Sequence, residues 1–113
     1  FIGSANCGGF FAPEMRLAGF DHLVIKGKAD KPVYLWIHNG DIEIRDAGHL
    51  WGHDAQESQT LIREELGDDD IQSLTIGVAG ENLVRFSCVM TSMKNAAGRT
   101  GIGAIWGSKN LKA

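Results

Sequence analysis

Two glycine-rich segments carry the residue types and the spacing that bind an anion. In "SANCGGFF", Gly8 and the glycine after it directly precede a predicted helix, where unpaired backbone N–H groups and the helix dipole favour negative charge. The segment "NAAGRTGIGAIWG" repeats the arrangement. There, Gly98 and Gly101 allow close backbone approach, and Arg99 offers a planar fork of donors suited to phosphate. Together the segments predict an elongated phosphorylated cofactor held between two loops.

The charge of the chain is unevenly distributed. Residues 1–81 hold all 14 acidic residues against 6 basic ones, whereas residues 82–113 hold 5 basic residues and no acid. The overall charge of −3 argues against a general nucleic-acid binder, and Trp106 alone is too small a stacking platform for one. The acid-free block, which includes Lys94 beside the second glycine segment, suits an anionic ligand instead. A non-catalytic domain that binds nucleic acid through this basic end is kept as a distant alternative.

Other patterns that could carry chemistry are weak. His49 and His53 stand four residues apart in "HLWGH", but Gly52 lies between them and no glutamate follows the first histidine, so a metal site is not predicted. Cys7 and Cys88 lack the C-x-x-C spacing of a metal or redox site. They are expected to be reduced, partly buried thiols of a cytoplasmic protein. No catalytic nucleophile, general acid or general base is predicted in these residues.

Three helices are expected around these segments. The first covers residues 11–18. The second covers 54–67, with Asp54 as N-cap and Glu57 three residues later, a pattern typical of a capped helix start. A third, glycine-rich helix is expected over 96–107.

Strands are expected where β-branched and aromatic residues cluster. The Asn39-Gly40 dipeptide predicts a hairpin turn, and a second turn is expected at Gly80-Glu81. Because strands and helices follow one another without a repeated β-α-β order, the pattern favours an α+β domain. No apolar run is long enough to span a membrane. The strands are predicted over 22–29, 32–39, 41–47, 71–80 and 82–90.

At this level of detail the sequence resembles a known family. The stretches "ANCGGFFAPEMRLAGFDHLVIKGKADKPVYLWI", "IEIRDAGHLWG", "IGVAGENLVRFSCVM" and "AAGRTGIGAIWGSKNLKA" are similar, in order and spacing, to the N-terminal domain of the aldehyde ferredoxin oxidoreductase family. The resemblance covers all 113 residues. It implies part of a single N-terminal domain whose two ends are cut, with C-terminal helical domains outside these residues.

The resemblance also implies a site. In that family, two related sheet layers form a base for a tungsten or, less often, molybdenum cofactor, in which two pterins hold the metal and magnesium bridges their phosphates. The backbone carbonyls of Asn6 and Ala96 would contact that magnesium. The cofactor contacts implied by the resemblance are Asn6, Gly8, Asn95, Ala96, Gly98 and Arg99.

The chain differs from the family pattern at two of these positions. Asn95 stands where relatives often carry arginine, so the neighbouring Lys94 is expected to supply charge there. Cys7 stands where relatives carry serine or another small residue. It is not read as a tungsten ligand, because the pterin dithiolenes already give the metal four sulfurs.

The resemblance implies an enzyme that oxidises aldehydes to carboxylic acids. Electrons would leave through a four-iron four-sulfur cluster, bound outside these residues, to ferredoxin or an iron–sulfur subunit. The same-family alternative is a benzoyl-coenzyme A reductase catalytic subunit. The resemblance further implies an oligomer with neither a nucleic-acid partner nor a membrane span.

Overall fold

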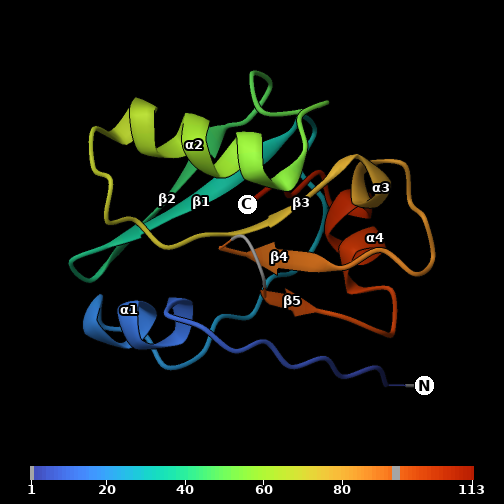
Figure 1. Ribbon diagram of the computed structural model, residues 1–113, viewed down its shortest axis with the longest axis horizontal. Helices are drawn as coiled ribbons and strands as arrows, with labels where there is room; N and C mark the ends of the chain where they lie inside the picture. Colours follow the sequence, from blue (N-terminus) through green and yellow to red (C-terminus); the bar gives the residue numbers. More distant parts are fainter. Residues whose placement is uncertain (1, 93–94) are drawn as a thin grey trace.

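The computed structural model describes residues 2–92 and 95–113, and Lys94 therefore lies outside the described residues. In this part of the chain, a two-stranded sheet and a three-stranded sheet are flanked by short helices (Figure 1). The α+β prediction is therefore confirmed. None of the helices described is both long and apolar enough to cross a bilayer.

The first sheet is a hairpin that follows helix α1 (Phe11–Leu17). Its strands β1 (Val33–His38) and β2 (Asp41–Asp46) pair antiparallel, with His38 opposite Asp41. Asn39 and Gly40 both have positive φ, 46° and 82°, as a type I′ turn requires. The predicted hairpin turn is therefore confirmed.

Helix α2 (Ala55–Leu66) covers one face of this hairpin (Figure 1). Its start is fixed by the Asp54 carboxylate, which accepts a hydrogen bond from the backbone N–H of Glu57 at 2.8 Å, and its end by Gly67 at φ 67°. The predicted capping therefore forms. The helix and hairpin enclose the first core, whose buried residues are Tyr34, Ala47, Leu50, Ile62 and Ile71.

The second sheet consists of β3 (Leu74–Ile76), β4 (Val89–Thr91) and β5 (Asn95–Ala97), in that order and antiparallel. Helices α3 (Val78–Glu81) and α4 (Ile102–Ser108) pack together beside it (Figure 1). The buried residues of the second core are Ile76, Val89 and Ala97.

Several predicted elements are wrong in this structure. Residues 22–29 belong to no strand, and Gly80-Glu81 lies inside α3 rather than in a turn between strands. A Cβ on Gly80 would lie 2.9 Å from the Gly103 carbonyl oxygen, so helix α3 packs closely against helix α4. The helix expected over 96–107 begins only at Ile102, because Asn95–Ala97 pairs with β4.

Residues 109–113 join the two sheets. Asn110 and Lys112 of this stretch bond to Val33 of the hairpin, since the Val33 N–H donates to the Asn110 carbonyl and the Lys112 N–H donates to the Val33 carbonyl, both at 2.8 Å. The Ile76 N–H of β3 donates to the Lys112 carbonyl at 3.0 Å. The fully buried Lys112 ammonium donates to the His53 carbonyl at 2.8 Å and pairs with Glu81 at 2.5 Å. One short segment therefore connects both sheets and α3.

Candidate functional site

The structure brings the two glycine-rich segments side by side. A Cβ built on Gly3 would lie 2.7 Å from the Thr100 Cβ, and one on Gly9 would lie 2.8 Å from the Asn95 Nδ2. Residues 3 to 9 therefore run antiparallel to residues 95 to 100, and Figure 1 shows the N-terminal segment passing along β5. The adjacency of the two loops, which the sequence only suggested, is thus a feature of the fold.

Alternating burial orients the N-terminal segment. Ala5 and Cys7 are half-buried and pack against the second core, whereas Ser4, Asn6 and Gly8 are exposed. This period of two is that of an extended chain with one face inward. Asn6 and Gly8 therefore face away from the core, where a ligand can reach them, and Cys7 serves packing.

The loop that precedes α4 has an unusual backbone. Arg99, Thr100 and Gly101 have positive φ values of 64°, 58° and 69° in succession. Left-handed conformations cost non-glycine residues about 1 kcal/mol or more each, and such strain gathers at functional sites. A Cβ on Gly101 would lie 2.5 Å from the Arg85 carbonyl oxygen, so Gly101 serves packing. Gly101 therefore has a packing reason to be glycine that is independent of any ligand.

Gly8 and Gly98 differ from the other motif glycines. Neither has a positive φ, and a Cβ on either would meet no protein atom within 4 Å. Cβ atoms on Gly103 and Gly107, in contrast, would collide with the Cys88 carbonyl and with Gly80. Within the described residues, nothing requires glycine at positions 8 and 98. The absence of a side chain there leaves the backbone open to a ligand.

Among the residues that the structure describes, arginine offers positive charge near the site. Arg85 and Arg99 are exposed, and neither side chain makes a hydrogen bond or ion pair among the described residues. Lys109 donates to the Gly27 carbonyl at 3.1 Å, and Lys112 is buried against Glu81. Among the described basic residues of 82–113, Lys109 and Lys112 are therefore less available to a ligand than the sequence suggested, whereas Arg99 is exposed within the second glycine-rich segment.

The remaining predicted residues surround the same place. Ala96 is exposed, whereas Asn95 is half-buried with its amide over Gly9. Among the described residues, the Asn6 carbonyl accepts no backbone hydrogen bond. Open glycines, an exposed carbonyl with no backbone partner among the described residues and an exposed guanidinium fit a phosphate-bearing cofactor with its counter-cation.

Side chains that could bind a metal directly do not converge here. Within residues 2–92 and 95–113, no three His, Cys, Asp or Glu side chains are grouped to hold an ion. The two histidines of "HLWGH" face different carboxylates, since His49 contacts Glu65 at 3.0 Å and His53 contacts Glu57 at 2.7 Å. A metal at this site would therefore take its ligands from the cofactor or from backbone carbonyls rather than from a cluster of such side chains.

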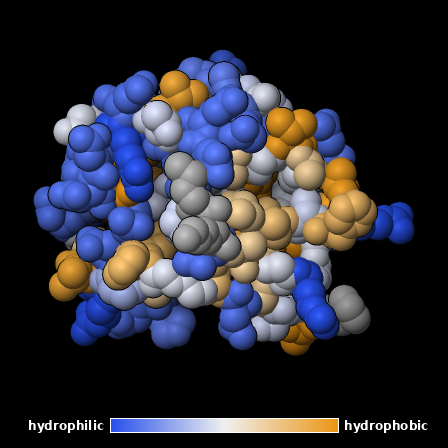
Figure 2. All heavy atoms as spheres, in the orientation of Figure 1, coloured by the Kyte–Doolittle hydropathy of each residue, from blue (hydrophilic) through white to orange (hydrophobic). Residues whose placement is uncertain are grey.

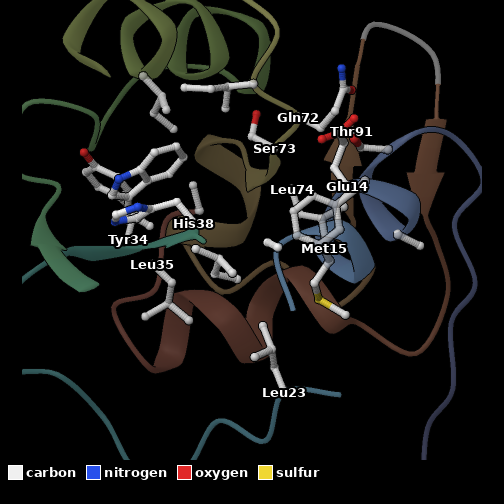
Figure 3. Close-up of a pocket in the computed structure, with 18 of the residues that line it drawn as sticks. Glu14, Met15, Leu23, Tyr34, Leu35, His38, Gln72, Ser73, Leu74 and Thr91 are labelled. Atoms are coloured by element: carbon white, nitrogen blue, oxygen red, sulfur yellow. The ribbon is translucent and has the colours of Figure 1, made fainter. Parts of the chain in front are cut away.

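A cavity of about 840 Å³ begins at this site and extends between α1, β1 and β3 (Figure 3). Cys7 and Gly8 border it at one side, and Trp36 and His38 of β1 line it further along. The Trp36 and His38 rings are stacked, with centroids 4.9 Å apart. Nothing in the sequence pattern indicated this space.

Tyr34 lies on the same strand at the border of this cavity and of the first core. Its hydroxyl donates to the Glu65 carboxylate at 3.0 Å. Burial of the phenol, together with this hydrogen bond and the charge of Glu65, raises the pKa of Tyr34 to about 12. The hydroxyl is therefore a neutral donor that ties β1 to α2.

Comparison with known proteins gives a consistent result. The family model described as "Aldehyde ferredoxin oxidoreductase, N-terminal domain" matches residues 1–113. The chain is 51% identical to the tungsten-containing aldehyde ferredoxin oxidoreductase of Pyrococcus furiosus and 48% identical to that of Thermococcus kodakarensis. Each match covers all of this chain and 19% of the relative's length.

A solved structure is also similar. It is the active site complex BamBC of benzoyl coenzyme A reductase in complex with 1,5 dienoyl-CoA, with a TM-score of 0.92 and 44% sequence identity. The match covers 96% of this chain and 16% of the solved chain. The 113 residues therefore span about a fifth of the relatives that they match.

Proposed function

The chain belongs to the aldehyde ferredoxin oxidoreductase family, and from this premise we propose that it is the tungstopterin-binding part of an aldehyde-oxidising enzyme. The observation that carries the proposal is the antiparallel contact of two glycine-rich segments that leaves Gly8 and Gly98 facing open space. Residues 1–113 would form part of a single N-terminal domain. The helical domains of the enzyme would lie outside them.

The two segments would hold the two pterins of one cofactor. Asn6 and Gly8 would contact one pterin from the N-terminal segment. The carbonyls of Asn6 and Ala96 would contact a magnesium ion between the two phosphates, which is the kind of oxygen ligand that magnesium prefers. The contacts to the second pterin would come from Asn95, Ala96, Gly98 and Arg99.

Each residue type has a physical role in this arrangement. The Arg99 guanidinium can donate two parallel hydrogen bonds to a phosphate. Gly8 and Gly98 let the backbone approach the ring system closely. When bound, the cofactor would supply the two-electron oxidation of an aldehyde to a carboxylic acid. The chain's own residues would bind it, orient it and balance its charge.

The other parts of the enzyme follow from the same proposal. A four-iron four-sulfur cluster and the acid and base residues near the substrate would lie outside residues 1–113. Electrons would pass to ferredoxin or to an iron–sulfur subunit. We further propose an oligomeric, cytoplasmic enzyme, in keeping with the half-buried free thiols of Cys7 and Cys88.

A second candidate is an aromatic-ring reductase of the benzoyl-coenzyme A type. The similarity of 0.92 in TM-score to the BamBC complex favours it specifically. Both candidates place the same cofactor on the same two segments. They differ in substrate, so activity with aldehydes and with aromatic coenzyme A thioesters distinguishes them.

The proposal is tested by elemental analysis of the full-length protein, purified without oxygen. We expect about one tungsten or molybdenum atom and about four iron atoms per chain. In a Gly98→Val variant the added side chain projects into the cofactor space, so the tungsten content should fall at least about tenfold while circular dichroism stays unchanged. Gly48→Val is the matched control, because Gly48 also has a negative φ and lies in a turn beside Asp46.

Wild-type protein that is folded and contains none of these metals would contradict the proposal. If the Gly98→Val variant retained all of its tungsten, the second segment would not bind the cofactor in the way that we propose. If Gly48→Val lost as much metal as Gly98→Val, the effect would be a general loss of stability, and the site assignment would fail.

A further inference from the structure

Glu81 and Lys112 form an ion pair inside the protein. The Glu81 side chain is 3% exposed and the Lys112 side chain is fully buried, and 2.5 Å separates the Glu81 Oε1 from the Lys112 Nζ. The two residues lie in the stretches "IGVAGEN" and "GSKNLKA", which the family resemblance singled out. Neither residue belongs to the cofactor contacts proposed above, so their burial together has another reason.

Backbone groups of one loop complete this pair. The Gly52 N–H donates to both carboxylate oxygens of Glu81, at 2.9 and 3.0 Å, and the Lys112 ammonium also donates to the His53 carbonyl at 2.8 Å. A buried ion pair adds little net stability, because taking two charges out of water costs nearly as much free energy as their attraction returns. Its directional bonds instead specify one arrangement of the elements that they join.

Helix α3 directs its charge inward and apolar side chains outward. Val78 at its start is 42% exposed and Leu83, just beyond its end, is 52% exposed, whereas the Glu81 carboxylate is buried. Figure 2 shows apolar atoms on the side of the molecule where α3 and α4 lie. A helix oriented by hydrophobic burial alone has the opposite arrangement, so the ion pair orients α3.

The ion pair also joins α3 to the chain just beyond α4. Glu81 is the last residue of α3, and Lys112 follows shortly after Ser108, where α4 ends. The two helices lie side by side (Figure 1) and touch through their backbones, since a Cβ on Gly107 would overlap the Gly80 carbonyl group. The ion pair therefore restricts movement of α4 along α3.

The other end of α4 continues from the second glycine-rich segment. A Cβ on Gly101 would lie 2.5 Å from the Arg85 carbonyl oxygen, and the Gly103 N–H donates to the Ser87 carbonyl at 3.2 Å. Residues 98–101 are thus continuous with α4 and lie against the stretch that follows α3. A displacement of α4 along α3 would therefore displace this backbone as well.

We propose that Glu81 and Lys112 are positioning residues of the cofactor site: their buried ion pair fixes α4 against α3 and thereby sets the backbone geometry of residues 98–101. Neither side chain touches the cofactor. Both act through α3 and α4. The inference rests on the proposed function, in which residues 98–101 contact one of the pterins.

The test is the double variant Glu81→Gln/Lys112→Met of the full-length protein. It removes both charges at nearly unchanged volume and leaves no unpaired buried ion, so its melting temperature should stay within about 4 °C of the wild-type value. In tungsten-free preparations of both proteins, hydrogen–deuterium exchange should be about tenfold faster in the variant at the amides of residues 103–105, which bond to Ser87 and Gly101. In preparations made with tungsten, the metal content of the variant should fall about tenfold.

Two further variants support this test. Tyr34→Phe is the matched control, because it also removes a buried polar contact, to Glu65, but in the first core. It should change neither the tungsten content nor the exchange at 103–105. Glu81→Gln alone keeps an acceptor for the Gly52 N–H and weakens only the bond to Lys112, so smaller changes in the same direction are expected. This single variant decides the question if the double variant does not fold.

Three outcomes overturn the inference. A folded variant with wild-type exchange at 103–105 means that the pair does not fix α4. Faster exchange with full tungsten content means that the site does not depend on this geometry, and an equal loss in Tyr34→Phe means a general effect of stability. Wild-type protein without tungsten contradicts the proposed function, and the exchange rates of the tungsten-free preparations then support or refute the fixing of α4 on their own.

Discussion

The glycines of the two segments fall into two groups, according to the atoms that a Cβ at each position would meet. Gly101 and Gly107 are glycine because a Cβ would collide with another part of the backbone, whereas Gly8 and Gly98 face open space. Sequence alone could not separate these groups, since both kinds stand in one motif. Similarly, Lys112 counts as ligand-facing charge in the sequence but is buried against Glu81 in the structure. The partners that decide both cases are distant in sequence.

The raised pKa of Tyr34 predicts how the free energy of unfolding depends on pH. Its hydroxyl is neutral and bonded to Glu65, so Tyr34→Phe should lower the free energy of unfolding by about 0.5–1.5 kcal/mol near neutral pH. Because folding raises its pKa to about 12, the folded state keeps the proton where the unfolded state, near pKa 10, has lost it. The stabilisation is therefore complete below about pH 10 and is lost as the pH rises toward 12.

Urea unfolding of the full-length protein at about pH 9 and about pH 11 measures this effect. The wild-type protein should lose more stability between these two values than Tyr34→Phe does. Equal losses in the two proteins would show that another group governs the alkaline transition.

Secondary structure was predictable where its determinants are local. Helix α2 forms as expected because Asp54 and Gly67 cap it within its own sequence, and the hairpin forms because Asn39 and Gly40 accept positive φ. Residues 22–29 were misassigned because a strand requires a partner, which no local pattern contains. Helix α3 was missed because its short coil depends on contact with α4.

The contact between α3 and α4 can be tested with Gly107→Ala. A Cβ at this position would overlap the Gly80 carbonyl group, so the helices must separate, at a cost of about 1–3 kcal/mol. Residues 98–101 lead directly into α4, so tungsten content should fall together with thermal stability. Thermal unfolding and metal analysis of the full-length protein measure both.

Ser108→Ala is the control for this substitution. Ser108 is exposed, and its hydroxyl only donates to the Ile105 carbonyl at 2.6 Å within the same helix. We expect a change within about 0.5 kcal/mol. A Gly107→Ala protein as stable as Ser108→Ala would show that the two helices can separate without cost.

At the scale of the whole molecule, residues 109–113 form one of the connections between the two sheets. This segment receives hydrogen bonds from Leu35 of the first sheet and from Ile76 of the second. The two cores are distinct clusters, so we expect the segment to transmit stability between the hairpin and the sheet that contains the candidate site. The sequence motif "GSKNLKA", which the resemblance singled out, therefore has a structural role as the connection between the sheets.

Leu111→Ala should consequently destabilise both sheets. Leu111 is 3% exposed, and truncation of such a residue costs about 2–5 kcal/mol. Hydrogen exchange should accelerate at the amides of Leu35 and Ile76 together, because both donate to carbonyls of this segment. Acceleration confined to one sheet would show that the two halves are stabilised independently.

The antiparallel contact between residues 3–9 and 95–100 also has a consequence for biosynthesis. Positions 6 and 96 are separated by 90 residues (96 − 6), so the first half of the site leaves the ribosome well before the second. At 5–20 residues per second, the delay is roughly 5 to 20 seconds. Throughout this interval the N-terminal loop has no β5 to lie against. If both loops hold one cofactor, as we propose, its stable capture must follow translation of both segments and is therefore a maturation step.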